Sequence, residues 1–232
     1  MEHQSKIVNR AIFFSLWAAC VVGFWSILPC LQYLGVIPFS VSLWKVFFLG
    51  TLQTVLFFGL VCWLSFKILP QTDLHPFRLH IRPAVVTGIL VGGAIFLIDK
   101  AVFHSSLLAG SHPPRWMGAV ASIYGAVNEE VLLRFFLFTF FYYLLGKCAK
   151  INRKNRLYFL WVVNIVVALL FGLGHLPAAF KLITPSAVEI FRILFLNGIA
   201  GVIFGWLYWS RGLWTAMAAH FVADLMLHVF LT

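Results

Sequence analysis

Hydrophobic residues form long runs along this chain, and short polar stretches separate one run from the next. A run of about 18 or more apolar residues can cross the hydrocarbon core of a membrane as one α-helix. Seven segments have this character, and an eighth would arise only if the long fourth one were divided: 11–36, 41–66, 84–103, 117–145, 157–174, 191–209 and 214–231. The pattern predicts an all-α fold, a polytopic transmembrane helix bundle that forms a single domain over residues 1–232.

The composition agrees with a membrane protein. Of the 232 residues, 62% are hydrophobic and 10% are charged, whereas a soluble domain is usually about half apolar and about a quarter charged. We therefore expect an integral, multi-pass protein whose main surroundings are the lipid bilayer. The compact length without an appended soluble domain favours a bacterial cell membrane.

The net charge of +10 comes largely from loops that would share one side of the membrane. The stretch GKCAKINRKNR at 146–156 is the most basic of them, and the outer loops carry little beyond Arg115 and Lys181. Because basic loops tend to stay in the cytoplasm, this asymmetry predicts a cytoplasmic N-terminus and a C-terminus outside. It gives no reason to expect a nucleic-acid partner. A lipid head-group site at 146–156 is the alternative to a pure topology signal.

Three polar motifs interrupt the apolar segments, and the first is NEEVLLRFF at 128–136. A charge within a membrane span is costly, so it usually has a functional reason. Glu130 and Arg134 are four residues apart, which places them on one helix face where they can form an ion pair. Glu129 is rotated by about 100° from Glu130 and needs another partner.

The second motif is FGLGHLP at 171–177, which we expect to end the fifth segment with His175. A single histidine at a membrane edge is either a hydrogen-bonded polar group or a ligand or catalyst. The third motif is HFVAD at 220–224 in the last segment, where His220 and Asp224 lie one helical turn apart and face the same way.

Together the three motifs supply carboxylates and imidazoles from three different helices. Such a set can activate a water molecule and stabilise the oxyanion of a cleaved amide. It can also bind zinc or another divalent metal, for which Glu129, His175 and His220 are the candidate ligands. The residues leave both the metal-assisted and the metal-independent chemistry open.

With these motifs in order, each on its own segment, the chain resembles the CPBP family of intramembrane proteases. This family is also called the CAAX protease and bacteriocin-processing (Abi) family. The resemblance covers about 117–228, the expected protease core. It rests on Glu-Glu-x-x-x-Arg, Phe-x-x-x-His and His-x-x-x-Asn/Asp, which correspond here to Glu129, Glu130 and Arg134, to Phe171 and His175, and to His220 and Asp224.

The resemblance implies a role for each matched residue. Glu129 would be the general base that activates the attacking water, assisted by His175. His220 and Asp224 would stabilise the oxyanion or orient one another. Asp224 stands where many members have Asn, and because a carboxylate only accepts hydrogen bonds, orienting His220 suits it better than direct contact with the oxyanion.

Glu130 and Arg134 would be the supporting ion pair, in agreement with their helical spacing. The resemblance implies an intramembrane endopeptidase, a hydrolase classed with the metalloendopeptidases, that acts on a membrane-associated or prenylated CAAX-type protein or peptide. A non-catalytic binding or immunity protein that uses the same polar cavity is the alternative, and a small transporter is a third class.

The predicted boundaries leave one conflict. They place His175 near the outer end of its segment, His220 closer to the inner end of its own, and Glu129 between them. A single site therefore requires tilted or broken helices, or boundaries that are shifted by about a turn.

Overall fold

The computed structural model describes the backbone of residues 2–103, 113–149 and 151–231, and the side chains from residue 9 onward. Every regular element in these ranges is helical, which confirms the all-α prediction. The α-helices are α1 (Glu2–Tyr33), α2 (Leu43–Ile68), α3 (Ile81–Ile98), α4 (Arg115–Tyr124), α5 (Thr139–Cys148), α6 (Arg156–Leu182), α7 (Ala187–Arg211) and α8 (Leu213–Leu225). Short 3-10 and π-helical segments adjoin these α-helices. They are the 3-10 turn η1 (Leu69–Gln71) and the π-helical turns η2 (Asp99–Phe103), η3 (Gly125–Glu129), η4 (Val131–Phe138) and η5 (Met226–Phe230).

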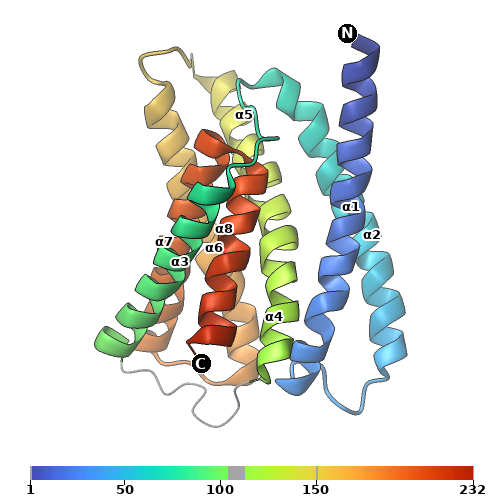
Figure 1. The fold of residues 1–232 in the computed structure, drawn as a ribbon, viewed down its shortest axis with the longest axis vertical. Coiled ribbons are helices and arrows are strands. Elements are labelled where there is room, and N and C mark those ends of the chain that lie inside the picture. Colours follow the sequence, from blue (N-terminus) through green and yellow to red (C-terminus); the bar gives the residue numbers. More distant parts are fainter. Residues whose placement is uncertain (1, 104–112, 150, 232) are drawn as a thin grey trace.

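Seven helices in the described ranges are long and apolar enough to cross a membrane. The fourth, Arg115–Cys148, is one span of 34 residues rather than two, because α4, η3, η4 and α5 follow one another along its length. An odd number of spans places the chain ends on opposite sides, and Figure 1 shows the N- and C-termini at opposite ends of the bundle. The cytoplasmic location of the N-terminus stays a prediction.

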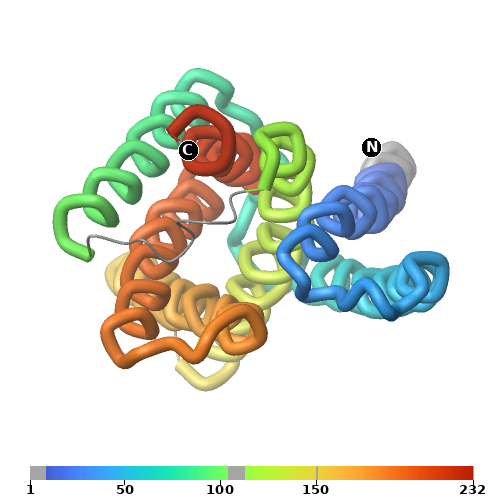
Figure 2. Tube along the Cα trace, turned by 90° about the horizontal axis from the view of Figure 1, so that it is seen from below, coloured from blue at the N-terminus to red at the C-terminus, as the bar shows by residue number. Residues whose placement is uncertain are grey.

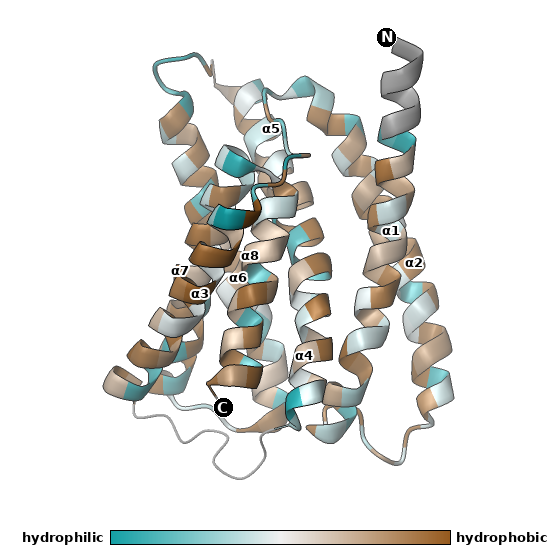
Figure 3. Ribbon diagram, in the orientation of Figure 1, coloured by the Kyte–Doolittle hydropathy of each residue, from teal (hydrophilic) through white to brown (hydrophobic). Residues whose placement is uncertain are grey.

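Exposed apolar side chains cover the outside of the bundle, as a lipid environment requires. On α2 they recur every three or four residues and so form one outward stripe: Trp44, Phe48, Leu52, Leu56, Leu60 and Trp63. Figure 3 shows hydrophobic positions along the helices and hydrophilic positions on the loops at the upper end. The protein is therefore an integral, multi-pass membrane protein.

Two helix boundaries differ from those predicted by hydropathy. Helix α6 continues to Leu182 with Pro177 inside it, so the FGLGHLP motif lies within the helix and does not end it. A proline removes one backbone donor, and the helix continues past Pro177 without that one hydrogen bond. Helix α7 begins at Ala187, because Ser186 and Glu189 form a capping box that a hydrophobic window does not detect.

The span Arg115–Cys148 lies in the middle of the molecule. The helices α1 and α2 pack against each other and against this span on one side. On the other side α3 packs on α8, α6 packs on α7, and α8 contacts α4 and η3 (Figure 2). Side chains on the inward face of the central span therefore meet side chains of α6, α7 and α8.

A tight turn at Gly212 sets the start of α8. Gly212 has a φ of 104°, which favours glycine, and a Cβ there would lie 2.5 Å from the carbonyl oxygen of Arg78. The next residue, Leu213, donates its N–H to the carbonyl of Pro76 at 2.6 Å. The segment before α3 thus fixes the first turn of α8, and His220 follows two turns later.

Candidate active site

Two π-helical turns shape the part of the central span that carries the adjacent glutamates. Glu129 ends η3, and Glu130 stands between η3 and η4. π-Helical turns inside α-helices are frequent at functional sites. Here they accompany an unusual contact, because the two consecutive glutamates approach the two ring nitrogens of the same imidazole, that of His220.

Glu130 is the centre of a buried charged cluster. Its Oε1 accepts a hydrogen bond from Nη1 of Arg134 at 2.7 Å and lies 2.8 Å from Nδ1 of His220. Glu130 and Arg134 are fully buried, and His220 is 4% exposed. Because a carboxylate only accepts, the Nδ1 of His220 must carry the proton and donate it to Glu130.

Aromatic rings and one backbone carbonyl surround the Arg134 guanidinium and the His220 ring. The guanidinium of Arg134 lies over the rings of Phe171 and Phe204, 4.9 and 5.7 Å from their centroids, and its Nη2 donates to the carbonyl of Gly201 at 3.2 Å. The imidazole of His220 stacks on Phe204 with ring centroids 4.7 Å apart. These contacts offset part of the cost of burying charge and fix the orientation of the His220 ring.

The opposite nitrogen of His220 faces two further carboxylates. Nε2 lies 3.8 Å from Oε2 of Glu129 and 3.6 Å from Oδ1 of Asp224, whose side chains are 24% and 18% exposed. Both distances exceed a direct hydrogen bond, and they suit one shared water molecule or substrate oxygen. A Cβ at Gly125 would lie 2.5 Å from Oδ2 of Asp224, so a glycine is needed beside this space.

His175 lies one turn beyond Phe171 on α6. Its Nδ1 is 2.8 Å from the carbonyl oxygen of Phe171, so Nδ1 carries a proton and the free Nε2 can accept one. Asp224 interacts electrostatically with His175 as well as with Glu129 and His220. Between these described residues, no hydrogen bond or ion pair joins His175 directly to Glu129 or His220.

The predicted boundaries placed His175, His220 and Glu129 at different depths in the membrane, but the structure brings them to one depth. Phe171 packs edge-on against both His175 and His220, with ring centroids 4.8 and 5.9 Å apart. All three motifs therefore meet at one level of the bundle, because α6 continues past His175 for almost two further turns. The catalytic roles of Glu129, His175, His220 and Asp224 stay predictions.

The sequence predicted one part of the cluster and missed another. The Glu130–Arg134 ion pair has the geometry expected from residues four apart in a helix. The hydrogen bond between Glu130 and His220 joins residues 90 positions apart, so no local spacing could indicate it. Phe204 was also missed, since one phenylalanine among the apolar residues of a span carries no signal of its own.

The predicted metal ligands do not form a ligand group as they are placed. Within the described residues, no group of three or more His, Cys, Asp or Glu side chains is arranged to hold a metal ion. Nδ1 of His220 is engaged by Glu130, and Nδ1 of His175 by a backbone carbonyl. The zinc set stays an expectation from the resemblance, and no step below is assigned to a metal.

A seven-span bundle with an internal cluster of carboxylates and imidazoles has the architecture of a polytopic intramembrane enzyme. A family model described as type II CAAX prenyl endopeptidase Rce1-like matches residues 111–226, half of the chain. The chain belongs to this family of CAAX intramembrane proteases, and the matched range contains every residue of the cluster. Comparisons with curated proteins and with solved structures gave no match.

Proposed function

We propose that the protein is an intramembrane endopeptidase in which Glu129 activates the water that attacks the scissile peptide bond. The observation that carries this proposal is the approach of Glu129 and Asp224 to the same nitrogen of a histidine whose other nitrogen is fixed by Glu130. A base and an oriented imidazole that faces it are the groups that amide hydrolysis needs.

In the proposed reaction, Glu129 takes a proton from water as the oxygen attacks the scissile carbonyl. His220, protonated on both nitrogens, donates from Nδ1 to Glu130 and from Nε2 to the developing oxyanion. The tetrahedral intermediate then collapses, the C–N bond breaks, and the proton held by Glu129 passes to the leaving amine. His175, with a free Nε2, assists the proton transfer, and Asp224 orients His220.

The proposed substrate is a membrane-associated protein or peptide that ends in a CAAX-type sequence. Family membership supports a peptide substrate, and the depth of the site within the spans suits a bond close to a lipid anchor. The direct assay uses a prenylated CAAX peptide in proteoliposomes and measures the released C-terminal fragment by mass spectrometry. An otherwise identical peptide without the prenyl group measures how much the lipid contributes.

Glu129→Gln is the decisive substitution, because it keeps the size of the side chain and removes the base. We expect it to lower the cleavage rate by about 100- to 10,000-fold without changing the unfolding temperature, since Glu129 is not part of the buried ion pair. The matched control is Glu189→Gln on α7, where glutamine can still complete the capping box.

Cleavage at the wild-type rate by Glu129→Gln would exclude the proposed base. A binding or immunity protein would show the same cellular phenotype with this variant as with the unchanged chain. Metal content of the purified protein, and the cleavage rate with and without a chelator, decide whether a divalent ion assists Glu129.

A further inference from the structure

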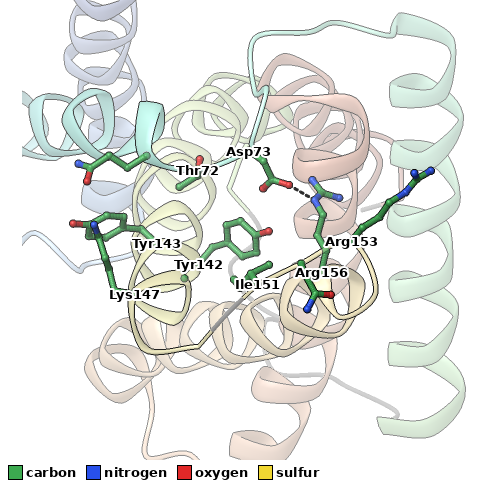
Figure 4. A pocket seen from close by; sticks show the side chains of 11 residues that line it. Thr72, Asp73, Tyr142, Tyr143, Lys147, Ile151, Arg153 and Arg156 are labelled. Atoms are coloured by element: carbon green, nitrogen blue, oxygen red, sulfur yellow. Dashed lines mark hydrogen bonds and ion pairs between the residues drawn. The ribbon is translucent and has the colours of Figure 1, made fainter.

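A polar pocket lies at the end of the bundle opposite the C-terminus, between the ends of α2, α5 and α6 (Figure 4). Its volume is about 530 Å³, which lies in the range of small-ligand sites. The lining includes three cationic side chains, Lys147, Arg153 and Arg156, and one carboxylate, that of Asp73. The pocket therefore carries an excess of positive charge.

The walls of this pocket are built by contacts between three separate segments. Asp73, which follows η1, forms an ion pair with Arg156 at the start of α6. The buried Tyr142 side chain of α5 reaches both members of this pair (Figure 4). Opposite them, Lys147 lies over the ring of Tyr143 at 5.3 Å.

Hydrogen bonds to Asn152 shape the turn that carries the two arginines. The side chain of Asn152 accepts hydrogen bonds from the N–H groups of Lys154 and Asn155, at 2.9 and 3.3 Å. The carbonyl of Asn152 accepts the N–H of Arg156 at 2.9 Å. Such local bonds define the turn at residues 152–156 that leads into α6 and carries Arg153.

Lys147 and Arg153 have no carboxylate partner among the described residues. Figure 4 shows them at opposite edges of the pocket, with Asp73, Tyr142 and Arg156 between them, and each adds a positive charge that attracts an anion.

The surroundings of the pocket indicate that this anion belongs to a lipid. Lys67 lies over the ring of Trp63 at 4.8 Å on the neighbouring helix α2, and tryptophan, tyrosine and lysine gather where helices leave the hydrocarbon core. Leu144 and Leu157, close to the pocket on α5 and α6, are exposed apolar residues on which acyl chains can pack. A free phosphate ion has no acyl chain that could pack on these two leucines.

We propose that this pocket binds the phosphate head group of an anionic membrane lipid, independently of the peptidase activity. Lys147 and Arg153 attract the phosphate from the two edges of the pocket, Arg156 lies beside it, and the acyl chains lie along the outer faces of α5 and α6. The basic 146–156 stretch would then serve as a lipid site as well as a topology signal.

The test titrates detergent-solubilised full-length protein with phosphatidylglycerol or phosphatidylcholine and counts bound lipids by native mass spectrometry. We expect Arg153→Gln to weaken phosphatidylglycerol binding about fivefold, and the double variant Lys147→Gln/Arg153→Gln about 25-fold. Phosphatidylcholine binding should change in neither variant. The matched control is Lys154→Gln, which removes the same charge from the same turn at an exposed position outside the pocket lining.

Two results would overturn the proposal. If Lys154→Gln weakens phosphatidylglycerol binding as much as Arg153→Gln, the effect comes from general surface charge and not from the pocket. If inorganic phosphate or glycerol phosphate displaces the lipid at equal concentration, the site takes a soluble phosphate. Circular dichroism and the unfolding temperature of each variant establish that a loss of binding is not a loss of fold.

Discussion

Two arginine–carboxylate pairs in this protein have the same chemistry and opposite surroundings. Arg134 and Glu130 pair inside the bundle with no exposed side-chain surface, whereas Arg156 and Asp73 pair at the helix ends with 34% and 51% of their side chains exposed. Inside the bundle, the stability of each charged group depends on its partner, because water cannot take the partner's place. At the helix ends, water and ions compete with the pair, so it contributes little to stability and can exchange partners.

Removal of the buried cation should have the largest effect on stability. Arg134→Ala leaves Glu130 buried with only His220 as a partner, and we expect the free energy of unfolding to fall by about 3–5 kcal/mol. Denaturant unfolding in detergent micelles measures it. The double variant Arg134→Met/Glu130→Gln, which removes both charges, should be more stable than Arg134→Ala. Wild-type stability of Arg134→Ala would show that the interior pair is no more important than the exposed one.

A small increase in side-chain volume beside the buried cluster should also lower stability. At Gly125, an added methyl group would meet Asp224 at 2.5 Å and Nε2 of His220 at 3.2 Å, so Asp224 must move. We expect Gly125→Ala to lower stability by about 1–3 kcal/mol and to reduce peptide cleavage more strongly than this loss explains.

The control for Gly125→Ala is Gly198→Ala on α7, where nothing lies within 4 Å of the added methyl group. There we expect unchanged cleavage and a small gain in stability, because alanine favours a helix. Equal behaviour of the two variants would mean that the space beside Asp224 is not constrained.

The same contrast explains what could be predicted from the sequence. Hydropathy predicted seven spans because each span repeats its signal over about twenty residues. The i,i+4 spacing predicted the Glu130–Arg134 pair because both residues share one helix. It could not predict that Glu130 also holds His220, since that contact depends on how α8 packs against the central span. The π-helical turns around Glu130 were missed too, because apolar composition does not distinguish them from α-helix.

The pocket at the helix ends was missed for a different reason. Basic loop residues have a sufficient explanation in membrane topology, and only the packing of three helix ends brings Asp73 to Arg156 across 83 positions. A topology signal needs the charge alone. A binding site also needs walls, and the sequence does not show which distant residue builds them.

Removal of the exposed Asp73–Arg156 pair should have the smallest effect on stability. It should strengthen lipid binding, whereas Arg153→Gln is expected to weaken it. Asp73→Asn removes the carboxylate but keeps the shape, and we expect the free energy of unfolding to fall by less than about 1 kcal/mol, with the difference shrinking as salt screens the pair. Because the pocket then loses its one negative charge, phosphatidylglycerol binding should strengthen about fivefold.

Denaturant unfolding at two salt concentrations and the lipid titration together test Asp73→Asn. A loss of stability as large as that of Arg134→Ala would place the Asp73–Arg156 pair in the structural framework and remove the contrast with the interior. Weaker phosphatidylglycerol binding would mean that Asp73 is needed to hold Arg156 in place. Stronger binding with nearly unchanged stability is expected, because a pair that contributes little to folding leaves its arginine free to contact a phosphate.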